Sequence, residues 1–199
     1  VHPDLDVALT VATAMRGVEE IRAGRVDAGL LTLPVEESDL VTVPVLREEL
    51  LLVTPPTHPL AKKKHVVPQD LAGEPFVLFE AGSATRRVID SFFVTEKIEP
   101  VIVMDTENVE IIKAMVKTGL GIGIVPYQAI AREVRARQFF CARIDGHDLV
   151  RETGWVYARA NRVPRMIHEL LAAFDVIKGR LELAPRRIAR QGESRYLLV

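Results

Sequence analysis

The sequence predicts an α/β protein, and three observations support this prediction. Apolar runs of strand length alternate along the chain with segments that repeat apolar residues every three or four positions. Glycine and proline residues stand at the ends of many of these segments, where strands and helices stop. The 199 residues are 48% hydrophobic and 27% charged, enough apolar material for one domain or two small ones. Alternating strands and helices are typical of a mostly parallel sheet with helices on both faces.

The first part of the chain contains several expected strands and one helix. Apolar and polar residues alternate over 5–11, which predicts a half-buried strand. Thr13 then begins a helix through about Ala23, and Gly24 stops it. Further strands are expected over 27–31, 41–46 and 49–54, and Pro55 and Pro56 end the last of them abruptly.

The middle of the chain continues the alternation. Strands are expected over 76–80 and 101–104. The helix between them begins near Ser83 and stops before Pro100, because the residue before a proline disfavours helical backbone. Its inward face is predicted to contain Val88, Ile89, Phe92 and Phe93.

The most informative stretch is 106–126, which joins a helix, a glycine stop and a buried strand. Gly119 fits the position after a helix where a left-handed backbone is needed. An apolar run over 122–125 then ends at Pro126. The helix before Gly119 has one apolar face, made by Val109, Ile112, Met115 and Val116.

The spacing of Gly119, Gly121 and Gly123 invites comparison with a dinucleotide-binding turn. That fingerprint follows a strand and opens a helix, whereas these glycines close a helix and open a strand. The favoured interpretation is that one glycine caps the helix. The others let the strand pass close to a neighbour or to a bound ligand.

The last part of the chain is expected to return to the first sheet. Residues 127–137 predict a helix, 139–144 a strand and 155–158 a returning strand. Pro164 stands in the first turn of a last strong helix, and 196–199 have the pattern of an edge strand.

The strand count predicts two sheets in two lobes. Crossovers at Pro55-Pro56 and near Thr153 would divide the chain into lobe I, 1–56 with 152–182, and lobe II, 57–151, with a tail over 183–199. Two crossovers make a hinged cleft, and clefts between domains are preferred ligand sites.

Composition and charge exclude several classes of protein. The formal net charge of −1 favours neither nucleic acid nor anionic membranes as partners of this chain. No apolar run approaches a transmembrane span, and the first residues lack a signal peptide, so a cytoplasmic location is expected. The single cysteine, Cys141, lies in an apolar run and is predicted to be a packed small hydrophobe.

Five segments, in this order and spacing, resemble the effector-binding domain of LysR-type bacterial transcriptional regulators. The resemblance extends from the first residue to about Lys178. Each segment alone is weakly specific, and their combination makes the resemblance strong. The segments are HPDLDV (2–7), GRVDAG (24–29), EELLLVTPPTHPLA (48–61), GSATR (82–86) and VKTGLGIGIVP (116–126).

This resemblance implies a type II periplasmic-binding-protein-like fold with two Rossmann-like lobes and a hinged cleft. It implies a small-molecule effector or co-inducer between the lobes, no other cofactor, and assembly as a homodimer or homotetramer. Family members carry an N-terminal winged helix-turn-helix that this chain lacks, so DNA is expected to be bound only through that part. A full effector domain also has a strand and helix before Val1, and residues 196–199 or a neighbouring chain are expected to fill that gap.

The junction of a strand and a helix at Ser83, Ala84 and Thr85 is the main candidate site. Backbone N–H groups and hydroxyls meet there at a helix N-terminus, which favours a carboxylate or another anion. Arg86 follows and is expected to help neutralise the ligand. The alternative is that Ser83 or Thr85 only caps its own helix; the family resemblance favours the binding role.

Similar junctions occur elsewhere in both lobes. Ligands of open α/β sheets bind beyond the carboxyl ends of strands, so these junctions are expected to face the cleft. Each residue alone is better explained as a cap than as a contact, and their convergence is the reason to keep them together. The complete predicted effector-binding set is Thr13, Thr32, Ser83, Ala84, Thr85, Arg86, Thr106, Asn108 and Pro126.

Catalysis has little support in the sequence. The histidines are scattered without metal-ligand spacing, and Ser83 lacks the glycine-flanked nucleophile elbow. The acidic pair Glu48-Glu49 is expected to lie on a solvated face rather than to act as acid and base. The sequence therefore predicts a non-enzymatic effector sensor that binds a small anionic metabolite. A transporter-linked solute-binding protein of the same fold is the first alternative, and an enzyme on this fold is the second.

Overall fold

The computed structural model describes residues 7–159 and 165–181, which form two compact units. Unit 1 comprises the described parts of 1–46 and 152–181, and unit 2 contains 47–151. The chain passes from unit 1 to unit 2 within β2 (Leu40–Thr54) and returns within β7 (Val150–Ala158). The crossovers expected from the sequence are at Pro55-Pro56 and near Thr153. The predicted edge strand at 196–199 lies outside the described residues.

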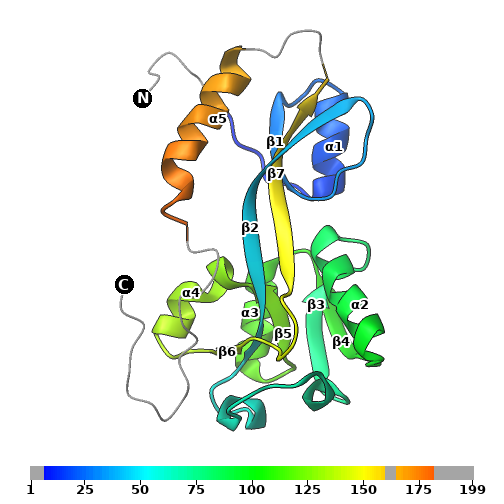
Figure 1. The fold of residues 1–199 in the computed structure, drawn as a ribbon, viewed down its shortest axis with the longest axis vertical. Helices are drawn as coiled ribbons and strands as arrows, with labels where there is room; N and C mark the ends of the chain where they lie inside the picture. The colour runs from blue at the N-terminus through cyan, green and yellow to red at the C-terminus, as the bar shows by residue number, and fades with distance from the viewer. Residues whose placement is uncertain (1–6, 160–164, 182–199) are drawn as a thin grey trace. The chain divides into compact units, whose positions relative to one another are not determined.

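Unit 1 is built on an antiparallel sheet. β1 (Ala28–Thr32) pairs with β7 so that Leu30 lies opposite Trp155, and β7 neighbours β2 (Figure 1). The helices of this unit are α1 (Ala14–Arg22), as the sequence predicted, and α5 (Arg165–Lys178). Phe174 of α5 packs edge-on against Trp155 at a ring distance of 5.7 Å. A small apolar core joins α1 to the sheet and contains Ile21, Leu31, Leu33, Leu40 and Val156.

The predicted first strand is wrong over its described part. Residues 7–13 adopt no regular secondary structure, and the side chains of Leu9 and Val11 are 93% and 100% exposed. Alternating apolar and polar residues make a strand only where a neighbouring strand supplies backbone partners and a surface to cover. The described residues of unit 1 supply none for this segment.

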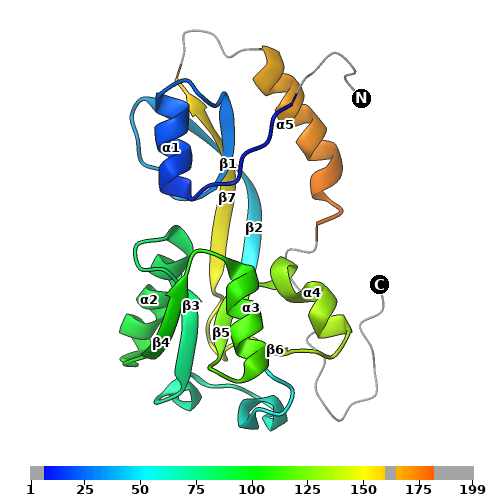
Figure 2. The same cartoon turned by 180° about the vertical axis from the view of Figure 1, so that it is seen from behind.

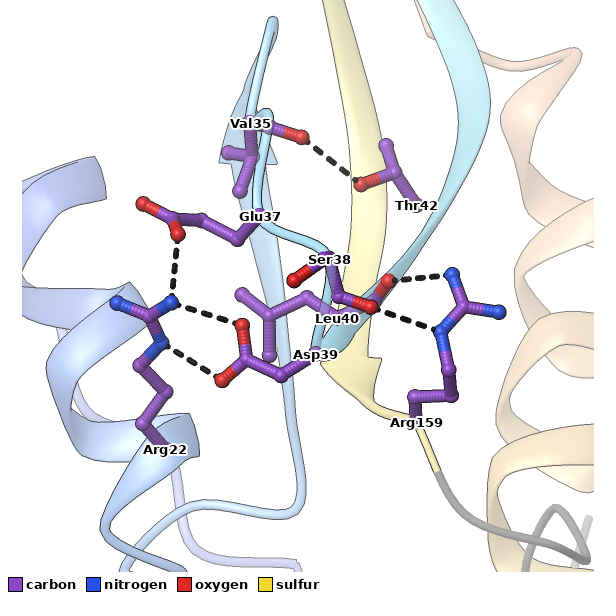
Figure 3. Close-up of polar contacts among 8 residues, drawn as sticks. All are labelled: Arg22, Val35, Glu37, Ser38, Asp39, Leu40, Thr42 and Arg159. Carbon is purple, nitrogen blue, oxygen red and sulfur yellow. Dashed lines mark hydrogen bonds and ion pairs between the residues drawn. The ribbon is translucent and has the colours of Figure 1, made fainter.

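Polar contacts hold the connection between β1 and β2 against the rest of unit 1 (Figure 3). The Arg22 guanidinium donates to both carboxylate oxygens of Asp39, at 2.8 and 2.9 Å, and also to Glu37. The hydrogen bond from Arg22 holds the pKa of the Asp39 carboxyl below its usual range. Arg159, the residue after β7, donates to the carbonyl oxygens of Ser38 and Leu40. These groups are solvent-exposed for the most part, so each contributes little to stability.

The sheet of unit 2 mixes two strand directions. β3 (Pro75–Phe79) and β4 (Val101–Thr106) are parallel, and Phe76 also forms a parallel bridge with Ile122, just before β5 (Gly123–Pro126). β5 and β6 (Phe140–Ala142) pair antiparallel with β2. The predicted mostly parallel sheet is therefore wrong for the described strands. The physical reason is that β2 and β7 carry the chain between the units in opposite directions, so each meets neighbours that run against it.

One long strand replaces two predicted ones. The sequence predicts strands over 41–46 and 49–54, but β2 is continuous through Arg47, Glu48 and Glu49. Successive side chains of a strand point to opposite faces. Each glutamate accordingly meets its own arginine, Arg151 for Glu48 and Arg143 for Glu49. Ion pairing on both faces lets a charged segment stay within the strand.

The helices of unit 2 bury the faces that the sequence predicted. α2 (Ala84–Glu96) buries Ile89, Phe92 and Phe93, and α3 (Val109–Thr118) buries Ile112 and Val116. Both helices pack on β3, and α4 (Tyr127–Arg135) packs on β5 (Figure 2). Burying an Ile or Phe side chain contributes about 1.5–3 kcal/mol, so unit 2 is held mainly by this core. The core also contains Leu51, Leu52, Val53, Leu71, Phe76, Leu78, Ile122, Ile124 and Ile130.

The two predicted roles of the glycines after α3 are confirmed. Gly119 ends α3 with φ +81°, in the left-handed region that favours glycine. A Cβ on Gly121 would lie 2.5 Å from the carbonyl oxygen of Pro75, so only glycine fits there. This approach lets the Ile122 N–H donate to the same oxygen at 2.8 Å, which attaches the segment to β3.

None of the helices in the described part of the chain is long and apolar enough to cross a membrane.

Candidate functional site

The carboxyl ends of three strands meet at one edge of the sheet in unit 2. β3 ends at Phe79, β4 at Thr106 and β5 at Pro126, and parallel pairing makes all three point the same way. A helix begins shortly after each strand, at Ala84, Val109 and Tyr127. In open α/β sheets, ligands bind beyond this edge. The structure therefore brings the predicted unit 2 residues to one edge.

Two backbone donors at the N-terminus of α2 have no hydrogen-bond acceptor among the described residues. Ser83 has extended backbone, with φ −64° and ψ 149°, and its Oγ accepts from the Arg86 N–H at 3.1 Å. This bond satisfies the third N–H of the helix. The N–H groups of Ala84 and Thr85 stand in the first two positions, where a helix has no carbonyl to offer them. Together with the positive end of the helix dipole, they can bind an anionic oxygen.

The Arg86 side chain is used by the fold. It is buried, its Nε donates to Asp90 Oδ1 at 2.7 Å, and one terminal nitrogen donates to the Phe79 carbonyl at 2.9 Å. These bonds join the end of β3 to the first turns of α2. Direct contact of Arg86 with an effector stays a prediction. Its described contacts indicate that it holds the start of α2 against the end of β3.

Asn108 caps the next helix, as the alternative interpretation of this residue expected, and Thr106 accepts a hydrogen bond from the capping residue. The Asn108 carbonyl oxygen of the side chain accepts from the Glu110 N–H at 2.9 Å. Thr106 Oγ1 accepts in turn from the Asn108 N–H at 3.2 Å. Pro126 ends β5 opposite Leu50 and is buried, without a side-chain hydrogen bond to offer. A binding role for these three residues stays a prediction.

An ion pair with a buried carboxylate lies beside Thr85, and no pattern in the sequence indicates it. Arg151 of β7 donates to both carboxylate oxygens of Glu48, at 2.9 and 3.3 Å, and to Thr85 Oγ1 at 2.9 Å. Glu48 is only 5% exposed, so the expectation of a solvated acidic face is wrong for it. Glu48 and Arg151 are separated by 103 positions, and no local pattern could have connected them.

Carboxylates near the same edge set a limit on where an anion can bind. Partial burial, together with the negative charges of Glu107 and Asp105, raises the pKa of the Glu80 carboxyl. Glu80 lies directly after β3, and its N–H donates to the Thr106 carbonyl at 3.1 Å. Like charges repel, so a second anionic group is disfavoured beside Glu80. An anionic oxygen at Ser83 to Thr85 stays a prediction.

The unit 1 candidates also share one end of their unit. Thr13 caps α1, and its hydroxyl accepts from the Arg16 N–H at 3.3 Å. Gly17 lies against Leu31, and Ile21 lies against Gly29, so α1 runs antiparallel to β1. The beginning of α1 therefore lies near the end of β1, where Thr32 stands. Their effector-binding role and the inter-lobe cleft stay predictions.

The described residues offer no support for metal or thiolate chemistry. They contain no group of three or more His, Cys, Asp or Glu side chains that could hold a metal ion. Burial raises the pKa of the Cys141 thiol to about 12. Cys141 is thus a neutral, buried side chain, which confirms its predicted packing role.

The fold agrees with that of known proteins. The LysR substrate binding domain matches residues 1–175, and the chain belongs to this family. The resemblance drawn from the five sequence segments is confirmed. The type II periplasmic-binding-protein-like fold that it implied is confirmed as well, because the similar solved structures are effector-binding domains of this family.

Particular relatives are transcriptional regulators. A probable RuBisCO transcriptional regulator of Trichormus variabilis is 30% identical over 167 residues, which cover 81% of this chain and 49% of that protein. The RuBisCO operon transcriptional regulator of Allochromatium vinosum is 28% identical over 164 residues, covering 81% of this chain and 54% of that protein. The chain thus spans about half the length of the curated relatives it matches.

Two solved structures illustrate the likeness in fold. The CcmR regulatory domain of Synechocystis PCC6803, in complex with 2-PG, has a TM-score of 0.79 and 22% identity, covering 88% of this chain and 85% of that chain. The BenM effector binding domain with benzoate has a TM-score of 0.74 and 21% identity, covering 90% of this chain and 81% of that chain.

Proposed function

We propose that this chain is the effector-sensing part of a transcriptional regulator and binds a small anionic molecule at the N-terminus of α2. The observation that carries the proposal is the pair of backbone donors at Ala84 and Thr85, which remain available after Ser83 has capped Arg86. An anionic oxygen is the partner that suits two N–H groups and a helix dipole.

The relatives support a regulatory role over transport. Those described above are transcriptional regulators, and none of them is a transporter-linked binding protein. The two structural neighbours described above were solved with 2-PG and with benzoate, and the effector binding domain of QuiR, another neighbour, with shikimate. Benzoate and shikimate each carry a carboxylate. A small carboxylate is therefore the first class of effector to test, with no other cofactor.

The remaining parts of the proposal concern assembly and location. The regulator acts in the cytoplasm, assembles as a homodimer or homotetramer, and contacts DNA through a winged helix-turn-helix outside this chain. In unit 2, β4 pairs with β3 alone among the described strands, and Val101, Ile102 and Val103 are exposed along it. An exposed apolar edge strand readily pairs with another chain, which supports assembly.

Binding must also favour one conformation to transmit a signal. A ligand with equal affinity for two states shifts neither, however tightly it binds. The proposal therefore expects an effector to change the equilibrium between two arrangements of the regulator.

A titration followed by NMR tests the binding part of the proposal directly. The ¹⁵N-labelled chain is titrated separately with benzoate, shikimate and inorganic phosphate, with sodium chloride as the ionic-strength control. The amide signals of Ala84 and Thr85 are expected to shift saturably with at least one probe and not with chloride. If no probe shifts these amides, or if all shifts follow ionic strength alone, the proposed site is wrong.

A further inference from the structure

The hydroxyl of Thr85 is buried with only half of its hydrogen-bonding capacity used. Thr85 is the second residue of α2 and is 4% exposed. Its Oγ1 accepts from Arg151 at 2.9 Å, and this is the only hydrogen bond that the described residues make with the hydroxyl. A hydroxyl is both a donor and an acceptor. A buried donor without a partner is unfavourable, so the proton of Thr85 calls for an acceptor.

The Arg151 guanidinium determines whether the Thr85 hydroxyl donates or accepts in their contact. Guanidinium groups donate hydrogen bonds and never accept them. The oxygen of Thr85 is therefore the acceptor in this contact, and its proton must be directed elsewhere. The two free N–H groups at Ala84 and Thr85 belong to the same turn of α2.

Glu48 holds the guanidinium in that orientation. Its two carboxylate oxygens accept from Nε and from one terminal nitrogen of Arg151, which leaves the other terminal nitrogen for Thr85. Bidentate pairs fix the plane of the guanidinium as well as its position. The sheet register explains the meeting, because Leu50 lies opposite Pro126 at the end of β5. Glu48, two residues before Leu50, extends beyond that end to the edge where α2 begins.

We propose that Arg151, held by Glu48, is a positioning residue that turns the Thr85 hydroxyl into a hydrogen-bond donor for the effector. The site then presents three donors from one helical turn, two N–H groups and one O–H, and selects a ligand oxygen that only accepts. A carboxylate or phosphate oxygen meets this requirement, whereas an amide N–H or an ammonium group does not. This inference rests on the proposed function, because it assumes that the effector binds at α2.

The chain supplies a matched control for Arg151. Arg143 makes the same kind of bidentate pair with Glu49, the residue next to Glu48, on the opposite face of β2. Replacing either arginine by lysine keeps the positive charge but removes the planar fork. The two substitutions therefore change the same chemistry. Arg151 is the one that donates to Thr85, so only its replacement is expected to weaken effector binding.

A double-mutant cycle measures whether Arg151 acts through Thr85. Dissociation constants for benzoate, shikimate and inorganic phosphate are obtained from the Ala84 amide shift in wild type, Thr85→Val, Arg151→Lys and the double variant. Thr85→Val is expected to weaken binding about tenfold, as the loss of one hydrogen bond to a charged group predicts. Arg151→Lys is expected to weaken it about fivefold alone and not at all in the Thr85→Val background. Arg143→Lys is expected to leave the affinity within about twofold of wild type.

Each failure has its own signature. If wild type binds no probe at Ala84, the proposed function is overturned and the inference falls with it. Suppose that wild type binds a probe, and that Arg151→Lys weakens affinity by the same factor in the wild-type and the Thr85→Val backgrounds. Only the inference is then overturned. Should Arg151→Lys not fold, Thr85→Ser decides, since it is expected to keep wild-type affinity within about threefold while Thr85→Val loses it. Equal affinity of Thr85→Val and wild type overturns the inference.

Discussion

Unit 1 and unit 2 differ in how much apolar material covers their sheets. The core of unit 2 is continuous from Leu50 through Phe76 and Ile89 to Ile144, and it involves α2, α3 and α4. The core of unit 1 is a small cluster around Ile21, Leu31 and Val156. Burial of apolar surface is the main stabilising contribution, and small cores supply little of it. Unit 1 is therefore expected to open at a lower free energy than unit 2.

This comparison also separates the two groups of candidate site residues. Ser83, Thr85 and Arg151 stand on elements anchored in the large core, whereas Thr13 and Thr32 belong to the small one. A binding site needs side chains held by a rigid surrounding structure. Unit 2 is thus expected to be the more rigid half for recognition, and unit 1 the half that opens more readily.

The largest expected difference is between two buried isoleucines. Ile112 of unit 2 is 0% exposed and Ile21 of unit 1 is 2% exposed. Ile112→Ala is expected to lower the free energy of unfolding by about 4 kcal/mol, and Ile21→Ala by about 2 kcal/mol, because a small core collapses more easily around a cavity. Urea unfolding with hydrogen exchange assigned to each unit measures both values. Equal losses would show that the two cores are equally well packed.

Two glycines test the same contrast in the backbone. A Cβ on Gly121 would lie 2.5 Å from the Pro75 carbonyl oxygen in unit 2, and one on Gly154 would lie 2.7 Å from the Val43 carbonyl oxygen in unit 1. Gly121→Ala is expected to destabilise by about 3 kcal/mol and Gly154→Ala by about 1.5 kcal/mol, since the looser unit can shift its strands. Thermal unfolding of both variants checks the order, and a larger loss for Gly154→Ala would reverse the comparison.

The candidate site gives the third difference. Ser83→Ala together with Thr85→Ala removes the cap of α2 and one hydroxyl donor, and it is expected to weaken benzoate, shikimate or phosphate binding about tenfold while the domain stays folded. Thr13→Ala removes the corresponding cap in unit 1 and measures whether that predicted contact also contributes to affinity. Arg143→Lys, outside the predicted set, is the control and is expected to change affinity less than twofold. Calorimetric titration with far-UV circular dichroism measures affinity and folding together. An unchanged affinity in the double variant would count against the site.

The smallest expected effect concerns pH. The pKa of Glu80 is raised by partial burial and by the charges of Glu107 and Asp105. A raised carboxyl pKa means that the folded state binds this proton more tightly, so the contribution of Glu80 to stability falls as pH rises through the raised pKa. Glu80→Gln is expected to make stability less dependent on pH in the weakly acidic range. The unfolding midpoints of both proteins, measured from about pH 4, near the ordinary pKa of glutamate, to about pH 7, test the direction of this change.

Much of the local structure was predictable because its causes are local. Ser83 and Asn108 are caps, Gly119 is a left-handed helix stop, and Ile112 and Val116 face the core as their spacing predicted. Each of these features depends on residues within one or two turns. The position of a strand to helix junction was predictable for the same reason, and with it the main part of the candidate site.

Predictions that needed knowledge of neighbours were less successful. The alternating segment at 7–11 is exposed because the described residues provide no neighbouring strand for it. The strand directions in unit 2 follow from β2 and β7 running oppositely, which no periodicity reveals. Glu48 and Glu49 have the composition of a solvated face, yet each meets an arginine far away in the sequence.

The sequence by itself determined the α/β class, the family, the capped N-terminus of α2 and the apolar faces that form the core of unit 2. These follow from spacing, from turn chemistry and from short segments in a fixed order. Only the tertiary structure decided that Arg151 reaches Thr85 and Glu48, across 66 and 103 positions of chain. The physical reason is that strand register, set by the packing of the whole sheet, brings together groups that the chain keeps far apart.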